Sequence, residues 1–256
     1  MRVVRRIADL GALAGDVGLV PTMGALHAGH EALIAAARDE CDTVVVSIFV
    51  NPAQFDDPAD LALYPRSEAD DVGLAEAAGA DVLFVPTPAE MYPPGFQTWV
   101  DVEELSRGLE GAHRPGHFRG VATVCLKLFN IVRPRYAYFG QKDAQQLAVL
   151  RRLVRDLDLA VTVRAVATVR DADGLALSSR NARLSPAERA AALALPRALA
   201  TRDPDRARAA LAGLDVDYVE RADFDPPVLA AAIRVGRTRL IDNVVLDSHV
   251  KTEESP

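Results

Sequence analysis

Apolar runs alternate with amphipathic stretches up to about residue 169. Apolar runs rich in β-branched or aromatic residues predict strands, and they occupy residues 17–20, 43–50, 81–85, 136–139 and 161–169. The continuous run 43–50 is typical of a strand buried on both faces. Stretches with helical periodicity lie between them, over residues 30–39, 67–78, 118–132 and 143–157, with Gly79 and Pro134 as stop signals. Because strands and helices alternate, we expect an α/β fold with a parallel sheet and helices on both faces.

The pattern changes after Asn181. Ser185 and Glu188 form a capping-box signature that opens a helix to about Ala200. A short helix over residues 205–211 and strands over residues 216–219, 230–235 and 239–246 follow. We therefore expect a Rossmann-like domain over residues 1–169 and a smaller α+β domain over residues 170–256, joined near residues 169–181 so that it can act as a lid. The polar tail 251–256 is expected to fray.

Composition and charge narrow the function classes. The chain has 256 residues and a formal net charge of −7. Proteins that bind nucleic acid usually carry a basic surplus, so nucleic acid is not an expected partner. A small anionic ligand remains compatible, because local charge can oppose the global sign.

The N-terminal sequence, the lengths of the apolar runs and the cysteines indicate the cellular compartment. Asp9 and Asp16 interrupt any signal-peptide core after the basic N-terminus, and no run approaches the length of a membrane span. Cys41 and Cys125 lie beside apolar runs and are expected to be buried and reduced. We therefore expect a cytoplasmic protein with no membrane contact.

Four of the five histidines fall in two clusters. His27 and His30 lie in Pro-Thr-Met-Gly-Ala-Leu-His-Ala-Gly-His, where a strand meets a helix. A helix start gathers backbone N–H groups that favour phosphate, and imidazoles can donate to phosphoryl oxygens. A metal pair is the alternative, but no HExxH-type carboxylate follows. The pattern favours phosphate contact.

Two further polar segments follow predicted strands. Asn51 and Gln54 come after residues 43–50, where neutral amides can bind a carboxylate or hydroxyl; the alternative is a plain turn at Asn51-Pro52. Lys142 follows residues 136–139 and could neutralise a triphosphate, with Asp143 as the N-cap of the next helix. The alternative for that segment is a capped helix with an exposed lysine.

Two loops carry arginines that suit anions. Ser178, Ser179 and Arg180 follow the last predicted strand of the sheet and can bind phosphate oxygens, although an interdomain linker would also be rich in turn formers. Arg114 and Arg119 lie in the loop 111–120 and could contact an anion, or the loop could be structural. Pro115 and Gly116 separate His113 from His117, which argues against a helical metal pair. The chain has no GxxxxGK[ST] and no GxGxxG motif.

Taken together, these segments resemble the pantoate–β-alanine ligase family from about residue 20 to residue 246. The likeness rests on PTMGALHAGH, SIFVNPAQF, YPR at residues 64–66, RPGHFRG, FGQKDAQQL, VRDADGLALSSRN and TRLIDN at residues 238–243. HxGH alone marks a superfamily of nucleotidyltransferases, whereas the combination and its order are more specific.

The resemblance implies a two-step activity. ATP and pantoate would give pantoyl adenylate and pyrophosphate, and β-alanine would then displace AMP to give pantothenate. It also implies Mg²⁺ held mainly by phosphates, and a homodimer. The alternatives are another HxGH nucleotidyltransferase, or a non-catalytic nucleotide-binding protein on the same fold.

The resemblance also implies roles for individual residues. His30, His27 and Lys142 would be catalytic, with His30 as the proton donor. Gln54 and Gln146 would bind pantoate, Gln54 later β-alanine, and Asn51 would assist. The ATP-binding residues would be Met23, Gly24, Ala25, Leu26, His27, Ala28, Gly29, His30, Gly140, Gln141, Lys142, Asp143, Val169, Leu177, Ser178, Ser179 and Arg180.

The chain departs from the family pattern at two of these positions. Gln141 stands where the family usually has Glu, which preserves a backbone role but not a carboxylate role. Leu177 replaces the usual Met and keeps the apolar volume. The C-terminal domain is also shorter than usual, between residues 200 and 215 and at its end.

Overall fold

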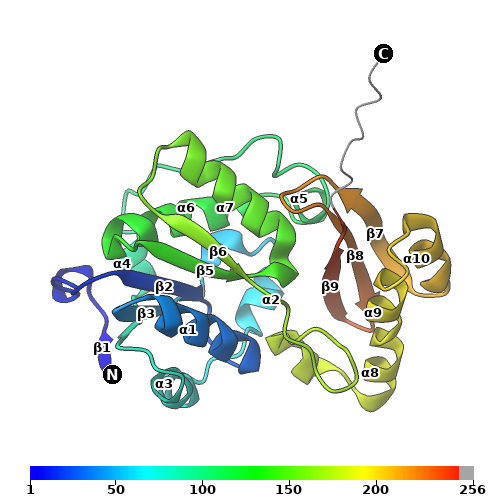
Figure 1. The fold of residues 1–256 in the computed structure, drawn as a ribbon, viewed down its shortest axis with the longest axis horizontal. Helices are drawn as coiled ribbons and strands as arrows, with labels where there is room; N and C mark the ends of the chain where they lie inside the picture. The colour runs from blue at the N-terminus through cyan, green and yellow to red at the C-terminus, as the bar shows by residue number, and fades with distance from the viewer. Residues whose placement is uncertain (248–256) are drawn as a thin grey trace.

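A computed structural model describes residues 1–247 and contains two sheets that lie side by side (Figure 1). The larger sheet has six strands in the order β1-β4-β3-β2-β5-β6, and every recorded pair is parallel. Its strands are β1 Arg2–Val4, β2 Val17–Thr22, β3 Thr43–Ile48, β4 Val82–Phe84, β5 Tyr136–Gly140 and β6 Thr162–Val166. The predicted parallel α/β sheet is confirmed.

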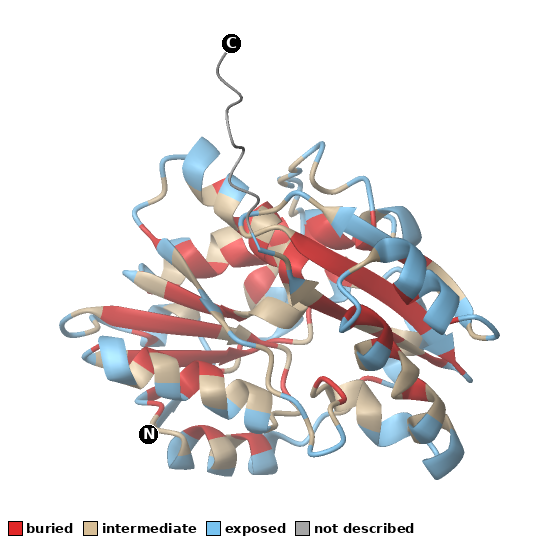
Figure 2. Ribbon diagram, turned by 45° about the vertical axis from the view of Figure 1, so that its right-hand side comes forward, coloured by how far each residue is buried: buried red, intermediate tan, exposed pale blue. Residues whose placement is uncertain are grey.

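Helices cover both faces of this sheet, because successive strand residues point to opposite sides. Leu19 packs with helices α6 (His117–Val132) and α7 (Ala144–Asp156) on one face. Val20 packs with α1 (Ala28–Glu40) and α3 (Glu68–Ala77) on the other. Figure 2 shows the strands buried between the helix layers, whose outer sides are exposed.

The smaller sheet is antiparallel and has its own core. Its strands are β7 Asp215–Ala222, β8 Val228–Val235 and β9 Thr238–Val245, in that order. Helices α8 Pro186–Ala192, α9 Ala194–Leu199 and α10 Pro204–Ala210 pack against it around a separate apolar cluster. The capping box at Ser185 and Glu188 is present. The helix predicted to about Ala200 is divided, because Pro196 has no N–H to donate to the carbonyl of Ala192.

Several short elements differ from the prediction. Strand β1 was not expected; it is a three-residue edge strand beside β4. Several helices are too short to give a periodic pattern in the sequence and were not predicted. They are α2 Pro58–Ala62, α4 Pro88–Met91, α5 Glu110–His113, η1 Ile7–Asp9, η2 Pro52–Gln54, η3 Gln141–Asp143 and η4 Ser179–Arg183. Strand β6 ends at Val166 rather than residue 169, because its partner β5 ends at Gly140 opposite Val166.

Other expectations have mixed outcomes. Cys41 and Cys125 are buried and free, as predicted. No helix within residues 1–247 is both long and apolar enough to span a bilayer. The boundary at residues 169/170 falls in the segment after β6 and stays a prediction, as does lid motion. The tail 251–256 lies outside the described residues.

The strand order determines where a ligand site can form. Strand β2 is the point at which the chain reverses direction across the sheet: β3 pairs on one side of it and β5 on the other. In open parallel sheets, ligands bind in the crevice outside the carboxyl ends of the strands at such a switch point. The segments after β2 and β5 contain His27, His30 and Lys142.

Candidate active site

A cavity of about 240 Å³ lies at the switch point between β2 and β5. Most of the predicted site residues line it together: Met23, His27, Gly29, His30, Asn51, Gln54, Gly140, Lys142, Asp143, Gln146, Val169, Leu177, Ser178, Ser179 and Arg180. Gly24, Ala25, Leu26, Ala28 and Gln141 are not among its lining residues. The structure therefore brings the four predicted polar segments to one place.

His27 and His30 form a reciprocal cap at the start of α1. The Nδ1 atom of His27 accepts from the backbone N–H of Gly29 at 3.1 Å. The Nδ1 atom of His30 accepts from the backbone N–H of His27 at 3.2 Å. Because each Nδ1 is an acceptor, each neutral ring carries its proton on Nε2. The ring centroids are 4.2 Å apart.

Burial keeps both imidazoles neutral near pH 7. Burial, followed by the electrostatic effects of the neighbouring His27 and Lys142, lowers the pKa of His30 to about 3. Burial and then Lys142 lower the pKa of His27 as well, opposed by Asp171. Two neutral imidazoles, each with its proton on Nε2, therefore line the cavity together with Lys142.

Asp71 holds the turn that precedes the histidines. Its carboxylate, which is 3% exposed, accepts from the backbone N–H of Ala25 at 3.0 Å and of Leu26 at 2.6 Å. Those N–H groups thus point to α3 rather than to the cavity, which explains why neither residue lines it. Ala25 has φ 51°, a strained conformation for a residue with a side chain. Asp71 therefore stabilises an unfavourable backbone beside the histidine cap.

Asn51 and Gln54 form an amide pair whose orientation is fixed. Asn51 is 1% exposed and donates through Nδ2 to Gln54 Oε1 at 2.9 Å, while its Oδ1 accepts from Tyr92 at 2.9 Å. Among residues 1–247, the Nε2 of Gln54 meets only the Met23 sulfur, at 3.2 Å, which is a weak acceptor. Gln54 thus has a donor to offer a ligand, and Asn51 supports it.

The segment after β5 turns through η3 before α7 begins. Lys142, Asp143 and Gln146 line the cavity there. Asp143 holds the N-cap position of α7 but makes no side-chain cap hydrogen bond, so the predicted capping role is wrong. Asp143 is a residue of the cavity wall.

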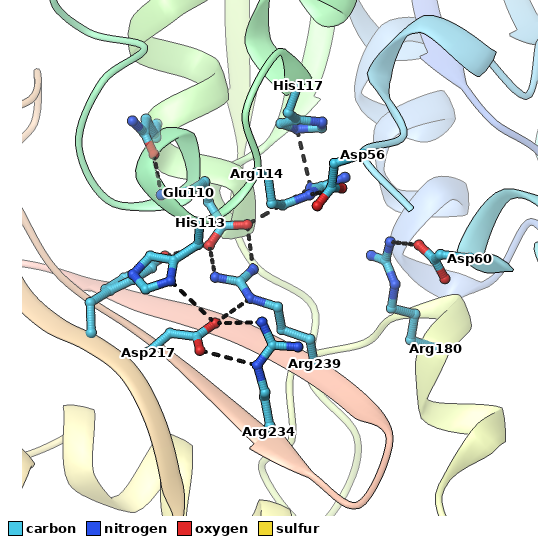
Figure 3. A network of polar contacts seen from close by, with 12 residues as sticks. Asp56, Asp60, Glu110, His113, Arg114, His117, Arg180, Asp217, Arg234 and Arg239 are labelled. Carbon is cyan, nitrogen blue, oxygen red and sulfur yellow. Dashed lines mark hydrogen bonds and ion pairs between the residues drawn. The ribbon is translucent and has the colours of Figure 1, made fainter. Parts of the chain in front are cut away.

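The loop over residues 178–180 follows β6 in the chain and also lines the cavity. Ser178 accepts from the backbone N–H of Arg180 at 3.2 Å and starts η4. The guanidinium of Arg180 pairs with Asp60 of α2 at 2.9 Å, and Arg183 pairs with the same carboxylate at 2.8 Å. These pairs join the loop to α2, and Figure 3 shows the pair between Arg180 and Asp60.

The sequence offered Arg114 as a possible anion contact and gave His117 no role, and both residues line the cavity. His117 Nδ1 donates to the backbone carbonyl of Gln54 at 2.8 Å, and its Nε2 meets Arg114 at 3.2 Å. Burial and then Arg114 lower the pKa of His117 to about 4. Arg119 lies elsewhere, paired with Asp101. Figure 3 shows Arg114 between Asp56 and Glu110.

A family model described as pantoate-beta-alanine ligase matches residues 2–245. The chain belongs to the pantoate–β-alanine ligase family. As a member of this family it is an amide-forming ligase, and the resemblance inferred from the motifs is confirmed.

Curated members of the ligase family match along nearly their whole length. The pantothenate synthetase of Heliobacterium modesticaldum is 52% identical over 280 residues, covering 96% of this chain and 100% of its own. That of Corynebacterium efficiens is 55% identical over 262 residues, covering 90% of this chain and 91% of its own.

Solved structures of the family agree with the fold. The pantothenate synthetase of Thermus thermophilus superposes with a TM-score of 0.92 at 45% identity, covering 96% of this chain and 99% of its own. The ligase of Francisella tularensis, whose structure holds β,γ-ATP and β-alanine, gives a TM-score of 0.86 at 34% identity, with 96% and 97% coverage.

Proposed function

We propose that this ligase makes pantothenate in two steps within the one cavity, activating pantoate as an adenylate and then transferring the pantoyl group to β-alanine. The observation that carries the proposal is the convergence of His27, His30 and Lys142 on one cavity from the ends of two neighbouring strands. A carboxylate that attacks the α-phosphorus of ATP needs no protein nucleophile. It needs placement and stabilisation of the charge that develops on phosphate oxygens.

The two histidines and Lys142 supply that stabilisation. His27 and His30 are neutral and donate through Nε2–H, so they serve as oriented hydrogen-bond donors rather than as point charges. Lys142 supplies the positive charge. The predicted role of His30 as a proton donor is thereby refined to donation from a neutral ring.

Arg180, Ser178 and Ser179 would complete the phosphate contacts when ATP binds. Arg180 forms an ion pair with Asp60 in the structure. A triphosphate would replace Asp60 as the stronger partner of the guanidinium. Val169 and Leu177 would contact the adenine or ribose. Gly24, Ala25, Leu26, Ala28 and Gln141 stay predicted as neighbours of the nucleotide.

Pantoate would bind on the amide side of the cavity. Gln54 would donate through Nε2 to pantoate and later contact β-alanine, and Gln146 would contact pantoate. Asn51 would act through Gln54, because its own amide is already engaged. Neutral amides suit this task because they bind the acid without lowering its nucleophilicity through a full positive charge.

Mg²⁺, cytoplasmic location and a homodimer are further parts of the proposal. Residues 1–247 contain no group of three or more His, Cys, Asp or Glu side chains placed to hold a metal ion. The ion would be held mainly by the nucleotide phosphates. None of the steps above depends on it.

The test is a pyrophosphate-release assay with ATP, pantoate and β-alanine, each omitted in turn. We expect pyrophosphate to require ATP and pantoate, and free AMP to appear only when β-alanine is added. A nucleotidyltransferase would give no amine-dependent AMP, and a nucleotide-binding protein would give no pyrophosphate. Either result would contradict the proposal.

A further inference from the structure

Asn243 of strand β9 contacts the turn that carries Lys142, although β9 belongs to the small sheet and the turn follows β5 of the large one. Its side chain is buried, and its Nδ2 donates to the carbonyl oxygen of Gln141 at 2.9 Å and of Lys142 at 2.8 Å. We propose that Asn243 is a positioning residue that fixes the Lys142 backbone for adenylation. The inference rests on the proposed contact of Lys142 with the phosphates.

The turn needs a restraint from outside, because its own sequence supplies little. Lys142 carries its charge on a flexible four-carbon stem, so the location of the ammonium depends on where the backbone is held. Strand β5 ends at Gly140, α7 begins at Ala144, and Asp143 caps nothing. One amide group that binds two successive carbonyls therefore fixes the turn.

The chemistry of the contact requires an amide donor. The Oδ1 of Asn243 is buried and finds no hydrogen-bond partner within residues 1–247. Only the NH₂ group of the side chain is used, and it is used twice. An aspartate has the same shape but would oppose a carboxylate to two carbonyl oxygens, so it tests donation separately from packing.

Asp242, the residue before Asn243, connects strand β9 to the second segment that is proposed to contact phosphate, the loop with Ser178 and Arg180. Asp242 is 2% exposed and pairs with Arg170 through two contacts, at 2.6 and 3.0 Å. Arg170 opens the loop that carries Ser178 and Arg180. Consecutive residues of β9 therefore hold both the Lys142 turn and the base of the Arg180 loop, so the small sheet sets the distance between the two cationic groups.

The experiment is a double-mutant cycle between Asn243→Asp and Lys142→Ala, read as the single-turnover rate of pyrophosphate release with ATP and pantoate. Displacing a catalytic group by about 1 Å costs up to about a hundredfold. We expect Asn243→Asp to slow this rate about tenfold or more in the parent enzyme, and less than about twofold in the Lys142→Ala background, because the residue it positions is gone. Asn243→Ser, which adds no charge, provides a second variant and should behave in the same direction.

Ile233→Val is the matched control. Ile233 is fully buried in the core of the same small sheet, so this change lowers stability modestly without touching the turn. It should leave the rate within about twofold. Equal losses in both Lys142 backgrounds, or an unchanged rate in both Asn243 variants, would overturn the inference while leaving the proposed function intact. A normal rate in Lys142→Ala alone would overturn the role of Lys142 and this inference with it.

Discussion

His30 Nδ1 accepts a hydrogen bond from the backbone N–H of His27 at 3.2 Å, and this contact has two consequences. It satisfies an N–H group at the start of α1, which has no partner within the helix. It also places the proton of the His30 ring on Nε2, where a phosphoryl oxygen can accept it. A structural cap and a candidate catalytic donor are thus the same side chain.

Replacing His30 by alanine should separate these two roles by magnitude. We expect adenylate formation to fall about a hundredfold or more, since removal of one preorganised donor costs about 3–4 kcal/mol in the transition state. Loss of the cap should cost only about 1 kcal/mol of folding free energy. Single-turnover pyrophosphate release and urea denaturation measure the two effects. Near-normal turnover in a folded variant would refute the assigned role.

Stability should fall as the solution becomes acidic. The pKa values of His30 and His117 are lowered to about 3 and about 4 in the folded protein, whereas an unfolded histidine titrates near 6.5. Between about pH 6.5 and pH 4 the unfolded chain therefore binds more protons than the folded protein. The free energy of unfolding consequently decreases as the pH is lowered.

The size of this effect can be checked by urea denaturation at pH 7 and pH 5. Each of these buried histidines should contribute a loss of about 2 kcal/mol over that interval. His30→Gln should reduce the total loss by about that amount. Equal stability of the parent protein at the two pH values would show that these rings are not held neutral by the fold.

Replacing Gln54 by alanine should act on substrate binding. In the part of the chain that the structure describes, the Nε2 of Gln54 has only a thioether partner, so its donor is available to pantoate. Loss of one such hydrogen bond, at about 1–1.5 kcal/mol, corresponds to about a tenfold rise in the KM for pantoate. The KM for ATP should change little. Steady-state kinetics with each substrate varied decides this, and an unchanged KM for pantoate would count against the assignment.

Asp71→Ala should loosen the turn before the histidine cap. The change leaves two partly buried N–H groups without their acceptor and releases a backbone in which Ala25 has positive φ. We expect a loss of about 1–3 kcal/mol in the free energy of unfolding, together with slower adenylation. Asp71→Asn, which keeps one acceptor oxygen, should lose less of both. If Asp71→Ala alters stability but not the single-turnover rate, the turn does not position His27 and His30.

The sequence predicted the larger sheet well because its signal is local. Residues 43–50 form a continuous β-branched run, and such a run must be buried on both faces whatever its neighbours are. Short elements carry no such signal. Strand β1 has three residues at the sheet edge, and its pairing with β4 joins positions about eighty residues apart in the chain.

The residues of the candidate site were predictable where a motif stands at the end of a strand, and not where their contacts are distant in the chain. Motifs at strand ends located His27, His30 and Lys142, since a parallel sheet gathers such ends at one edge. The sequence analysis did not identify Asp71, because its hydrogen-bond partners lie 45 and 46 positions away and its helix carries no motif. Asn243 stands in a motif of the family resemblance, but only the folded structure shows it beside Lys142.

The most direct test of adenylation follows an oxygen atom. Pantoate labelled with ¹⁸O in its carboxyl group is converted with ATP and β-alanine, and the released AMP is analysed by mass spectrometry. If the carboxylate attacks the α-phosphorus in the cavity of His27, His30 and Lys142, AMP carries one labelled oxygen from pantoate. Unlabelled AMP, or label in pyrophosphate or inorganic phosphate, would contradict the account.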